Sequence, residues 1–251
     1  MSEFYLILAG LFLPLFPFSM AFNAIFSRID NIWVRYLVLL VWPQIGLIIL
    51  IQQEIVIPDW IAIWGLLTAL LYAFRLLTIR ELGLWTSFIA TSAWALLWII
   101  LQSSKEPSIY LYALGFSVPL MLLVSLSAEL TKRFGAAYVG LYGGLAITQP
   151  RFTGILVMVI LAVIATPVFP AFFTVLHAII LTVPTSLSMA IMAGIVWLLW
   201  TWAGARVLNG LIVGPAEQVE IPDLSAGHAW GYSSMLVGLV VVSLSLIGGL
   251  P

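Results

Sequence analysis

Charged residues are scarce and cysteine is absent in this sequence of 251 residues. Only 8% of the residues are charged and 63% are hydrophobic, whereas about 25% charged residues are usual in a soluble protein. No soluble fold could bury this much apolar surface, so lipid must be the solvent for most of the chain. The lack of cysteine excludes disulfides, thiolate metal sites and cysteine-bound iron–sulfur clusters. We therefore expect no metal site and no cofactor, and the net charge of -1 gives no reason to expect nucleic-acid binding.

Motifs that carry catalysis are also missing. The sequence has no phosphate-binding glycine loop followed by lysine, no paired histidines and no acidic pair at helical spacing. Ser186 and Ser188 have no nearby base. We therefore expect no catalytic residues and no enzyme activity in this chain, although a complex that contains it could include an enzyme. Tryptophans such as Trp197, Trp200 and Trp202 suit interfacial belts and helix packing better than a cofactor site.

Apolar runs of about 20 residues dominate the chain, without the alternation that is typical of barrel strands. They predict an all-α, polytopic transmembrane helix bundle with about eight spans. The predicted spans cover residues 4 to 26, 34 to 52, 57 to 76, 83 to 103, 107 to 130, 152 to 183, 185 to 208 and 231 to 249. The first of them follows Glu3 and no basic residue, so we expect a retained span and not a cleaved signal peptide. The glycine-rich stretch from Ala136 to Thr148 is too short to cross, and we expect it to lie close against a neighbour at one membrane face.

The basic residues sort to one side of this arrangement. Eight of the nine lie on one side, namely Arg28, Arg35, Arg75, Arg80, Lys132, Arg133, Arg151 and Arg206, and only Lys105 lies opposite. Basic residues collect on the cytoplasmic side of membrane proteins. We therefore expect the loops with Arg28, Arg80, Lys132 and Arg206 in the cytoplasm and both termini outside, in a bacterial inner (plasma) membrane.

The predicted sixth span, residues 152 to 183, is unusually long and contains Thr166, Pro167 and Pro170 in its middle. Each proline removes a backbone donor and strains the preceding turn, so we expect a broken helix here. Broken helices form ion sites in some transporters. A proline kink that only shapes helix packing explains the pattern equally well.

Ionisable side chains, which an ion pathway usually needs, are nearly absent from the predicted membrane interior. The candidate pathway residues are His177, the one ionisable group at some depth, Gln44 in the second span, and Glu129 near a span end. His177 could act as a proton relay, but a lone histidine is more often a hydrogen-bonded packing residue. Gln44 and Asn23 are explained more simply by hydrogen bonds between helices.

Several motifs follow one another in a distinctive order after residue 57. They are Trp64 to Ala69, the turn from Arg75 to Glu81, Arg133-Phe134-Gly135 before Gly143 to Ala146, the broken segment Ala165 to Phe173, and Trp200 to Gly214 before Asp223-Leu224. This order resembles the antiporter-like membrane subunits of respiratory complex I, membrane-bound hydrogenases and multi-subunit sodium/proton antiporters. The resemblance implies that residues 57–251 form the C-terminal half of such a subunit, with six transmembrane helices. Residues 1–56 would form two further transmembrane helices that the resemblance does not place.

The resemblance also implies that this chain is a degenerate relative. The family has a histidine and a lysine in the span that here reads Phe116 to Leu120, and an ionisable residue after the break. Here Phe116, Leu120 and Val175 take those places, and His177 lies two residues further on.

This pattern implies a non-catalytic, structural or coupling subunit of a larger proton- or other ion-translocating complex. Such a complex could be complex I-like, hydrogenase-like or an inorganic-carbon uptake assembly. The implied partners are other membrane subunits, among them a full-length antiporter-like subunit, and a soluble catalytic subunit, with the lipid bilayer around them. The alternative is a stand-alone secondary transporter whose site is the broken sixth span. A membrane enzyme is the third hypothesis and has the least support.

Overall fold

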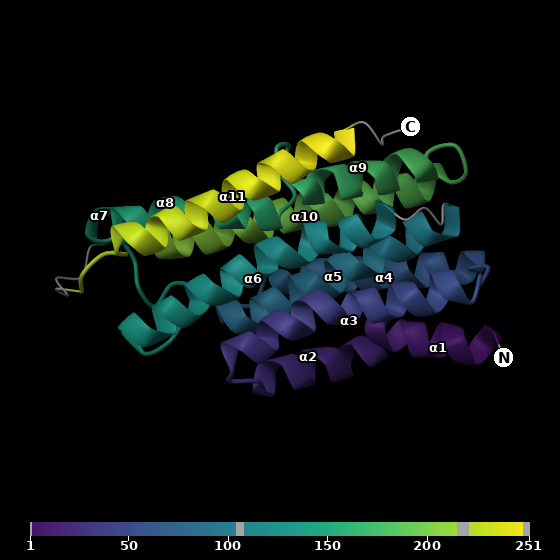
Figure 1. The fold of residues 1–251 in the computed structure, drawn as a ribbon, viewed down its shortest axis with the longest axis horizontal. Helices are drawn as coiled ribbons and strands as arrows, with labels where there is room; N and C mark the ends of the chain where they lie inside the picture. The colour runs from purple at the N-terminus through teal and green to yellow at the C-terminus, as the bar shows by residue number, and fades with distance from the viewer. Residues whose placement is uncertain (1, 104–107, 215–220, 248–251) are drawn as a thin grey trace.

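The computed structural model describes residues 2–103, 108–214 and 221–247. These residues form eleven α-helices, most of which run side by side along one axis (Figure 1). The helices are α1 Ser2–Phe12, α2 Phe18–Arg28, α3 Ile32–Gln52, α4 Asp59–Leu76, α5 Leu82–Ser103, α6 Ser108–Phe134, α7 Leu145–Thr148, α8 Pro150–Val163, α9 Pro170–Thr182, α10 Leu187–Ile212 and α11 Ala226–Ile247. Six of the described helices, α3 to α6, α10 and α11, are long and apolar enough to cross a membrane. The predicted all-α, polytopic membrane bundle is confirmed, and the chain is an integral membrane protein.

The predicted sixth span is indeed broken. Helix α8 ends at Val163 and α9 begins at Pro170, so the break falls where Thr166 and Pro167 were expected to place it. Both helices are apolar but too short to span alone. Together they occupy the place of one pass through the bundle.

The first predicted span, residues 4 to 26, is not one continuous helix. Helix α1 ends at Phe12 and α2 begins at Phe18, and the two lie end to end along one edge of the bundle (Figure 1). Pro14 and Pro17 lie between them, and each lacks the backbone donor that a continuous helix needs. This break was not predicted from the sequence, so the described chain contains two broken spans and not one.

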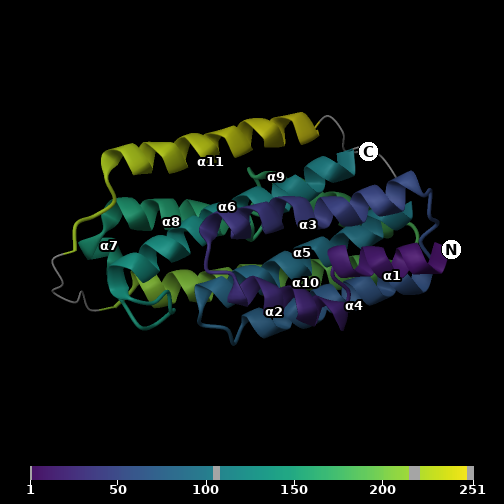
Figure 2. The same ribbon diagram turned by 60° about the horizontal axis from the view of Figure 1, so that its bottom comes forward.

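Helix α5 lies at the centre of the bundle and is buried along nearly its whole length. It packs against α2, α4, α6 and α9. Helix α3 packs against α1 and α6, and α10 against α4, α8 and α9. Helix α11 is the outermost helix in Figure 2 and rests on α8 and α9. The outer faces of α3, α4, α10 and α11 expose large apolar side chains, as expected of surfaces in contact with lipid.

The start of α1 and the end of α11 lie at the same end of the bundle (Figure 1). The C-terminal ends of α2, α4, α6 and α10 lie at the opposite end, which we call the basic end because Arg28, Arg80, Lys132 and Arg206 lie in or near these helix ends. The predicted sorting of basic residues therefore agrees with the helix order. That the basic end faces the cytoplasm stays a prediction. Lys105, and the predicted span limits at residues 107 and 249, lie outside the described residues.

The glycine-rich stretch after α6 stays at the basic end and does not cross, as predicted. It forms short bridges, including one between Glu81 and Tyr138, and ends in the single turn of α7. A Cβ atom on Gly143 would lie 3.0 Å from the carbonyl oxygen of Val213, at the end of α10. A side chain at this position would press against the backbone of the neighbouring segment, so glycine favours the close approach of the two segments.

Candidate functional site

The break between α8 and α9 is closed by its own backbone and by one threonine. The backbone nitrogen and the hydroxyl of Thr166 both donate to the carbonyl oxygen of Leu161, over 3.1 and 3.0 Å. Ala165 adopts a φ of 59°, a left-handed conformation that is costly for a residue with a side chain. Phe169 then donates its backbone N–H to the carbonyl oxygen of Thr166, over 3.2 Å, directly before Pro170 begins α9.

Neighbouring helices supply the remaining donors to this break. The indole Nε1 of Trp197, on α10, lies 3.2 Å from the carbonyl oxygen of Ile164 and 3.1 Å from that of Ala165. The hydroxyl of Ser243, on α11, donates to the carbonyl oxygen of Val168 over 2.6 Å. Carbonyl groups that lose their helical hydrogen bonds at a break inside a membrane need such partners. Here they accept hydrogen bonds from protein side chains, which favours a packing role for the break over an ion site.

The break between α1 and α2 is held in a similar way by three tryptophans. Trp42 donates to the carbonyl oxygen of Leu11 over 3.1 Å, Trp98 to that of Leu13 over 3.0 Å, and Trp64 to that of Phe16 over 2.7 Å. The backbone nitrogen of Phe16 donates to the hydroxyl of Thr68 over 3.2 Å. Helices α3, α4 and α5 thus each contribute a donor to the first break.

A shared sequence pattern underlies both breaks and could have revealed the first one. Residues 14 to 17 read Pro-Leu-Phe-Pro and residues 167 to 170 read Pro-Val-Phe-Pro. The two prolines have the same spacing, and an aliphatic residue and a phenylalanine stand between them. The tryptophan donors have no comparable signal, because their partners are distant in sequence.

The three candidate pathway residues all belong to α6 or contact it, but at different heights. Gln44 donates from Nε2 to the carbonyl oxygen of Tyr110 over 3.2 Å. The buried ring of His177 lies 5.3 Å from the ring of Tyr112, with an angle of 39° between the ring planes. Glu129 instead lies roughly 25 Å further along α6, at about 1.5 Å of rise per residue. The structure therefore brings Gln44 and His177 to one part of α6 and leaves Glu129 near the basic end.

Glu129 forms an ion pair with Arg133, with its carboxylate oxygen 3.2 Å from the arginine Nε. Arg133 also donates from Nη1 to the side-chain oxygen of Gln149 over 3.3 Å and to the carbonyl oxygen of Pro222 over 2.8 Å. The residue after Pro222 is Asp223, whose carboxylate accepts hydrogen bonds from backbone N–H groups at the start of α8. This cluster ties the end of α6 and the segment before α11 to α8, so Glu129 has a structural partner and an interfacial position.

Phe116, Leu120 and Val175, the positions where the resemblance implies ionisable groups in the family, are buried apolar side chains. Phe116, Leu120 and Val175 are 3%, 2% and 1% exposed. The ring of Phe116 meets that of Trp200 edge-on, with 5.9 Å between the ring centres. The middle of α6 therefore packs against α9 and meets Trp200 of α10 through apolar and aromatic side chains.

A row of uncharged polar side chains crosses the bundle centre and was not found from the sequence. Ser19 donates to the hydroxyl of Tyr72 over 2.9 Å, and Thr91 lies 3.4 Å from the side-chain oxygen of Asn23. On the other face of α5, Trp200 donates to the hydroxyl of Ser92 over 2.9 Å, and Ser92 donates in turn to the carbonyl oxygen of Ala69 over 2.7 Å. These bonds connect α2, α4, α5 and α10, as expected of polar groups that hold membrane helices together. Within the described ranges, no three histidine or acidic side chains come together as a metal site would require.

No protein family and no curated protein matches the sequence. A chain of respiratory complex I from Thermus thermophilus superimposes with a TM-score of 0.84 at 14% identity, over 96% of this chain and 54% of that chain. This chain therefore shares its fold with part of that chain. A chain of the Mrp complex from Dietzia sp. superimposes with a TM-score of 0.73 at 14% identity, over 97% of this chain and 56% of that chain.

This chain spans about half the length of the two chains that it matches. Both of those chains come from multi-subunit membrane complexes. The resemblance inferred from the order of sequence motifs is thus confirmed for the fold.

Proposed function

We propose that this chain is a non-catalytic integral membrane subunit of a larger ion-translocating complex, in which it has a structural or coupling role. The observation that carries the proposal is the apolar, buried environment at Phe116, Leu120 and Val175 inside an antiporter-like fold. An ion or proton in a membrane interior needs ionisable or strongly polar groups, because desolvation of charge is costly there. The polar row across α5 is uncharged and engaged in helix-to-helix hydrogen bonds, so other subunits would supply the conducting groups.

The proposed partners are a full-length antiporter-like subunit and a soluble catalytic subunit. The matches to chains of complex I and of an Mrp complex support a multi-subunit setting. A complex I-like, a hydrogenase-like and an inorganic-carbon uptake assembly would each accommodate such a subunit. We also propose that residues 57–251 correspond to the C-terminal half of an antiporter-like subunit. The 96% coverage supports extending the shared fold into the helices of residues 1–56.

The alternative, a stand-alone secondary transporter with its site at Thr166, Pro167 and Pro170, has less support. Trp197 and Ser243 donate hydrogen bonds to the carbonyl oxygens of this break. A substrate would have to displace these donors to reach the same oxygens.

Two measurements test the proposal. Affinity purification of the tagged chain from its native membrane in a mild detergent should bring down stoichiometric membrane and soluble partners, identified by mass spectrometry. The chain purified alone and reconstituted into liposomes should show no proton or sodium flux above empty liposomes. Purification without partners, together with solute or ion transport by the isolated chain, would establish the alternative.

A further inference from the structure

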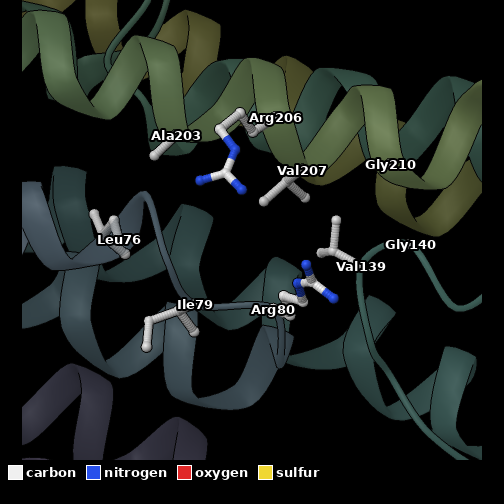
Figure 3. Close-up of a pocket in the computed structure, with 9 residues that line it drawn as sticks. All are labelled: Leu76, Ile79, Arg80, Val139, Gly140, Ala203, Arg206, Val207 and Gly210. Atoms are coloured by element: carbon white, nitrogen blue, oxygen red, sulfur yellow. The ribbon is translucent and has the colours of Figure 1, made fainter.

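Two arginines face each other across a pocket at the basic end of the bundle. Arg80 reaches in from the connection between α4 and α5, and Arg206 reaches in from α10, on the opposite wall (Figure 3). The pocket has a volume of about 290 Å³, and Ile79, Val139 and Val207 contribute apolar walls. Arginine head groups therefore project into a cavity that is otherwise largely apolar.

The charges of these arginines are not balanced within the pocket. None of the acidic residues that the structure describes lines it. Among residues 2–103, 108–214 and 221–247, the only ion pair is that of Arg133 with Glu129, so neither Arg80 nor Arg206 has a carboxylate partner there. Two guanidinium groups that share a cavity repel each other unless an anion lies between them. Their planar forks match the oxygens of a phosphate group, to which arginine can bind through two parallel hydrogen bonds.

Backbone hydrogen bonds fix the three segments that frame this pocket. Val139 donates its N–H to the carbonyl oxygen of Arg80 over 2.8 Å, and Gly140 donates to that of Gly210 over 3.1 Å. A Cβ atom on Gly210 would lie 2.5 Å from a methyl carbon of Val139, so a larger residue at this position would displace the Val139 side chain. The arginines thus extend from backbone positions that are set before any ligand binds, which lowers the entropic cost of binding.

An apolar stripe leads from the pocket toward the membrane interior. Leu198 and Trp202 precede Arg206 at intervals of four residues, so all three side chains lie along one face of α10. Leu198 is 66% exposed and Trp202 is 59% exposed. A tryptophan one turn below an arginine is the arrangement found where a helix passes from hydrocarbon into the headgroup layer.

We propose that the pocket between Arg80 and Arg206 binds the phosphodiester headgroup of an anionic phospholipid. The two guanidinium groups hold the phosphate, and the acyl chains lie along Trp202 and Leu198. Basic pockets between transmembrane helices bind lipid headgroups in this way. A free phosphate ion would use the same two arginines but would gain nothing from the apolar stripe. The site is independent of the proposed place of the chain in a larger complex.

The test measures lipid binding to the full chain in a neutral detergent by native mass spectrometry. Phosphatidylglycerol is the anionic probe and phosphatidylcholine the neutral one. The Arg80→Gln/Arg206→Gln double variant should bind phosphatidylglycerol about twenty-five-fold more weakly, since each arginine near a membrane surface contributes roughly fivefold. Arg28→Gln removes an exposed charge at the same end and should leave binding unchanged. The Arg80→Lys/Arg206→Lys double variant keeps both positive charges but lacks the planar guanidinium groups. Its affinity for phosphatidylglycerol should lie between those of the double glutamine variant and the unmodified chain.

Three outcomes would overturn the lipid proposal. The first is undiminished phosphatidylglycerol binding by the double glutamine variant. The second is equal binding of phosphatidylcholine and phosphatidylglycerol by the unmodified chain. The third is an equal rise in the thermal unfolding midpoint with inorganic phosphate and with phosphatidylglycerol, lost for both probes in the double variant, which would make this a free-phosphate site. Thermal unfolding without lipid shows whether each variant is folded. If the double variant misfolds, the single variants Arg80→Gln and Arg206→Gln replace it. Each single variant should bind phosphatidylglycerol about fivefold more weakly.

Discussion

The indole Nε1 of Trp98 donates a hydrogen bond to the carbonyl oxygen of Leu13, 3.0 Å away in the buried centre of the bundle. Trp98 belongs to the central helix α5, and Leu13 directly precedes Pro14 in the first broken span. At the second break, the indole of Trp197 from α10 donates in the same way to the carbonyl oxygens of Ile164 and Ala165. Both breaks are therefore held by indole donors from neighbouring helices, so the packing of the bundle depends on the two breaks and on these tryptophans together.

The first prediction concerns this bond at Leu13. Trp98→Phe keeps an aromatic ring in the core but removes the donor, which leaves the carbonyl oxygen of Leu13 buried without its side-chain partner. We expect the free energy of unfolding to fall by about 1–3 kcal/mol, the usual cost of stranding a buried polar group. The midpoint of thermal unfolding in detergent measures the effect.

Trp230→Phe is the matched control for this variant. Trp230 lies on α11 and is 76% exposed, so its loss should leave the unfolding midpoint nearly unchanged. Equal midpoints for Trp98→Phe and Trp230→Phe would show that the bond to Leu13 does not contribute to stability.

The helical membrane bundle and the second break could be predicted from the sequence, because composition, run length and paired prolines report them directly. The first break was missed although Pro14 and Pro17 have the same spacing as Pro167 and Pro170. The reason is length. Residues 4 to 26 fit one membrane crossing, whereas residues 152 to 183 were too long for one and drew attention to their prolines.

The arrangement of the candidate site could be predicted only in part. His177, Gln44 and Glu129 stand out because ionisable or amide groups are rare in apolar runs. The hydrogen bonds that organise the centre join residues 53 positions apart, in the pair Ser19 and Tyr72, and 108 positions apart, in the pair Trp200 and Ser92. Serine and tryptophan are ordinary in membrane helices, so no local pattern reveals which of them meet.

A second prediction concerns Asp223, whose carboxylate accepts the backbone N–H groups of Arg151 and Phe152 over 2.8 and 3.2 Å. These are donors at the start of α8 that the helix itself cannot satisfy. Asp223→Ala should lower stability by about 0.5–2 kcal/mol, as for other lost helix caps. Because the cap also anchors the segment before α11, limited proteolysis should cut between Val213 and Ser225 faster than in the unmodified chain.

Asp30→Ala removes an exposed carboxylate at the same end of the bundle and serves as the control. It should leave both stability and cleavage rate unchanged. A cleavage rate for Asp223→Ala that matches this control would mean that the cap does not hold the segment in place.

A third prediction separates the two roles considered for His177. If the ring serves packing against Tyr112, His177→Phe should preserve both assembly and the ion flux of the purified complex. His177→Ala should lower stability by about 1 kcal/mol through loss of the ring contact, again without loss of flux. Flux that disappears in His177→Phe while all partners still co-purify would identify His177 as a proton relay.

The last prediction addresses orientation and uses the natural absence of cysteine in this chain. Ser27→Cys places a single thiol beside Arg28 at the basic end, and Gln53→Cys places one at the opposite end, after α3. Both positions are exposed, so either thiol can react. With the basic end in the cytoplasm, a membrane-impermeant maleimide should label Gln53→Cys in intact cells and should label Ser27→Cys only after the membrane is permeabilised. The reverse labelling pattern would invert the predicted topology and put the Arg80 and Arg206 pocket in the outer leaflet. Labelling of both thiols in intact cells would contradict the placement of the two ends on opposite sides of the membrane.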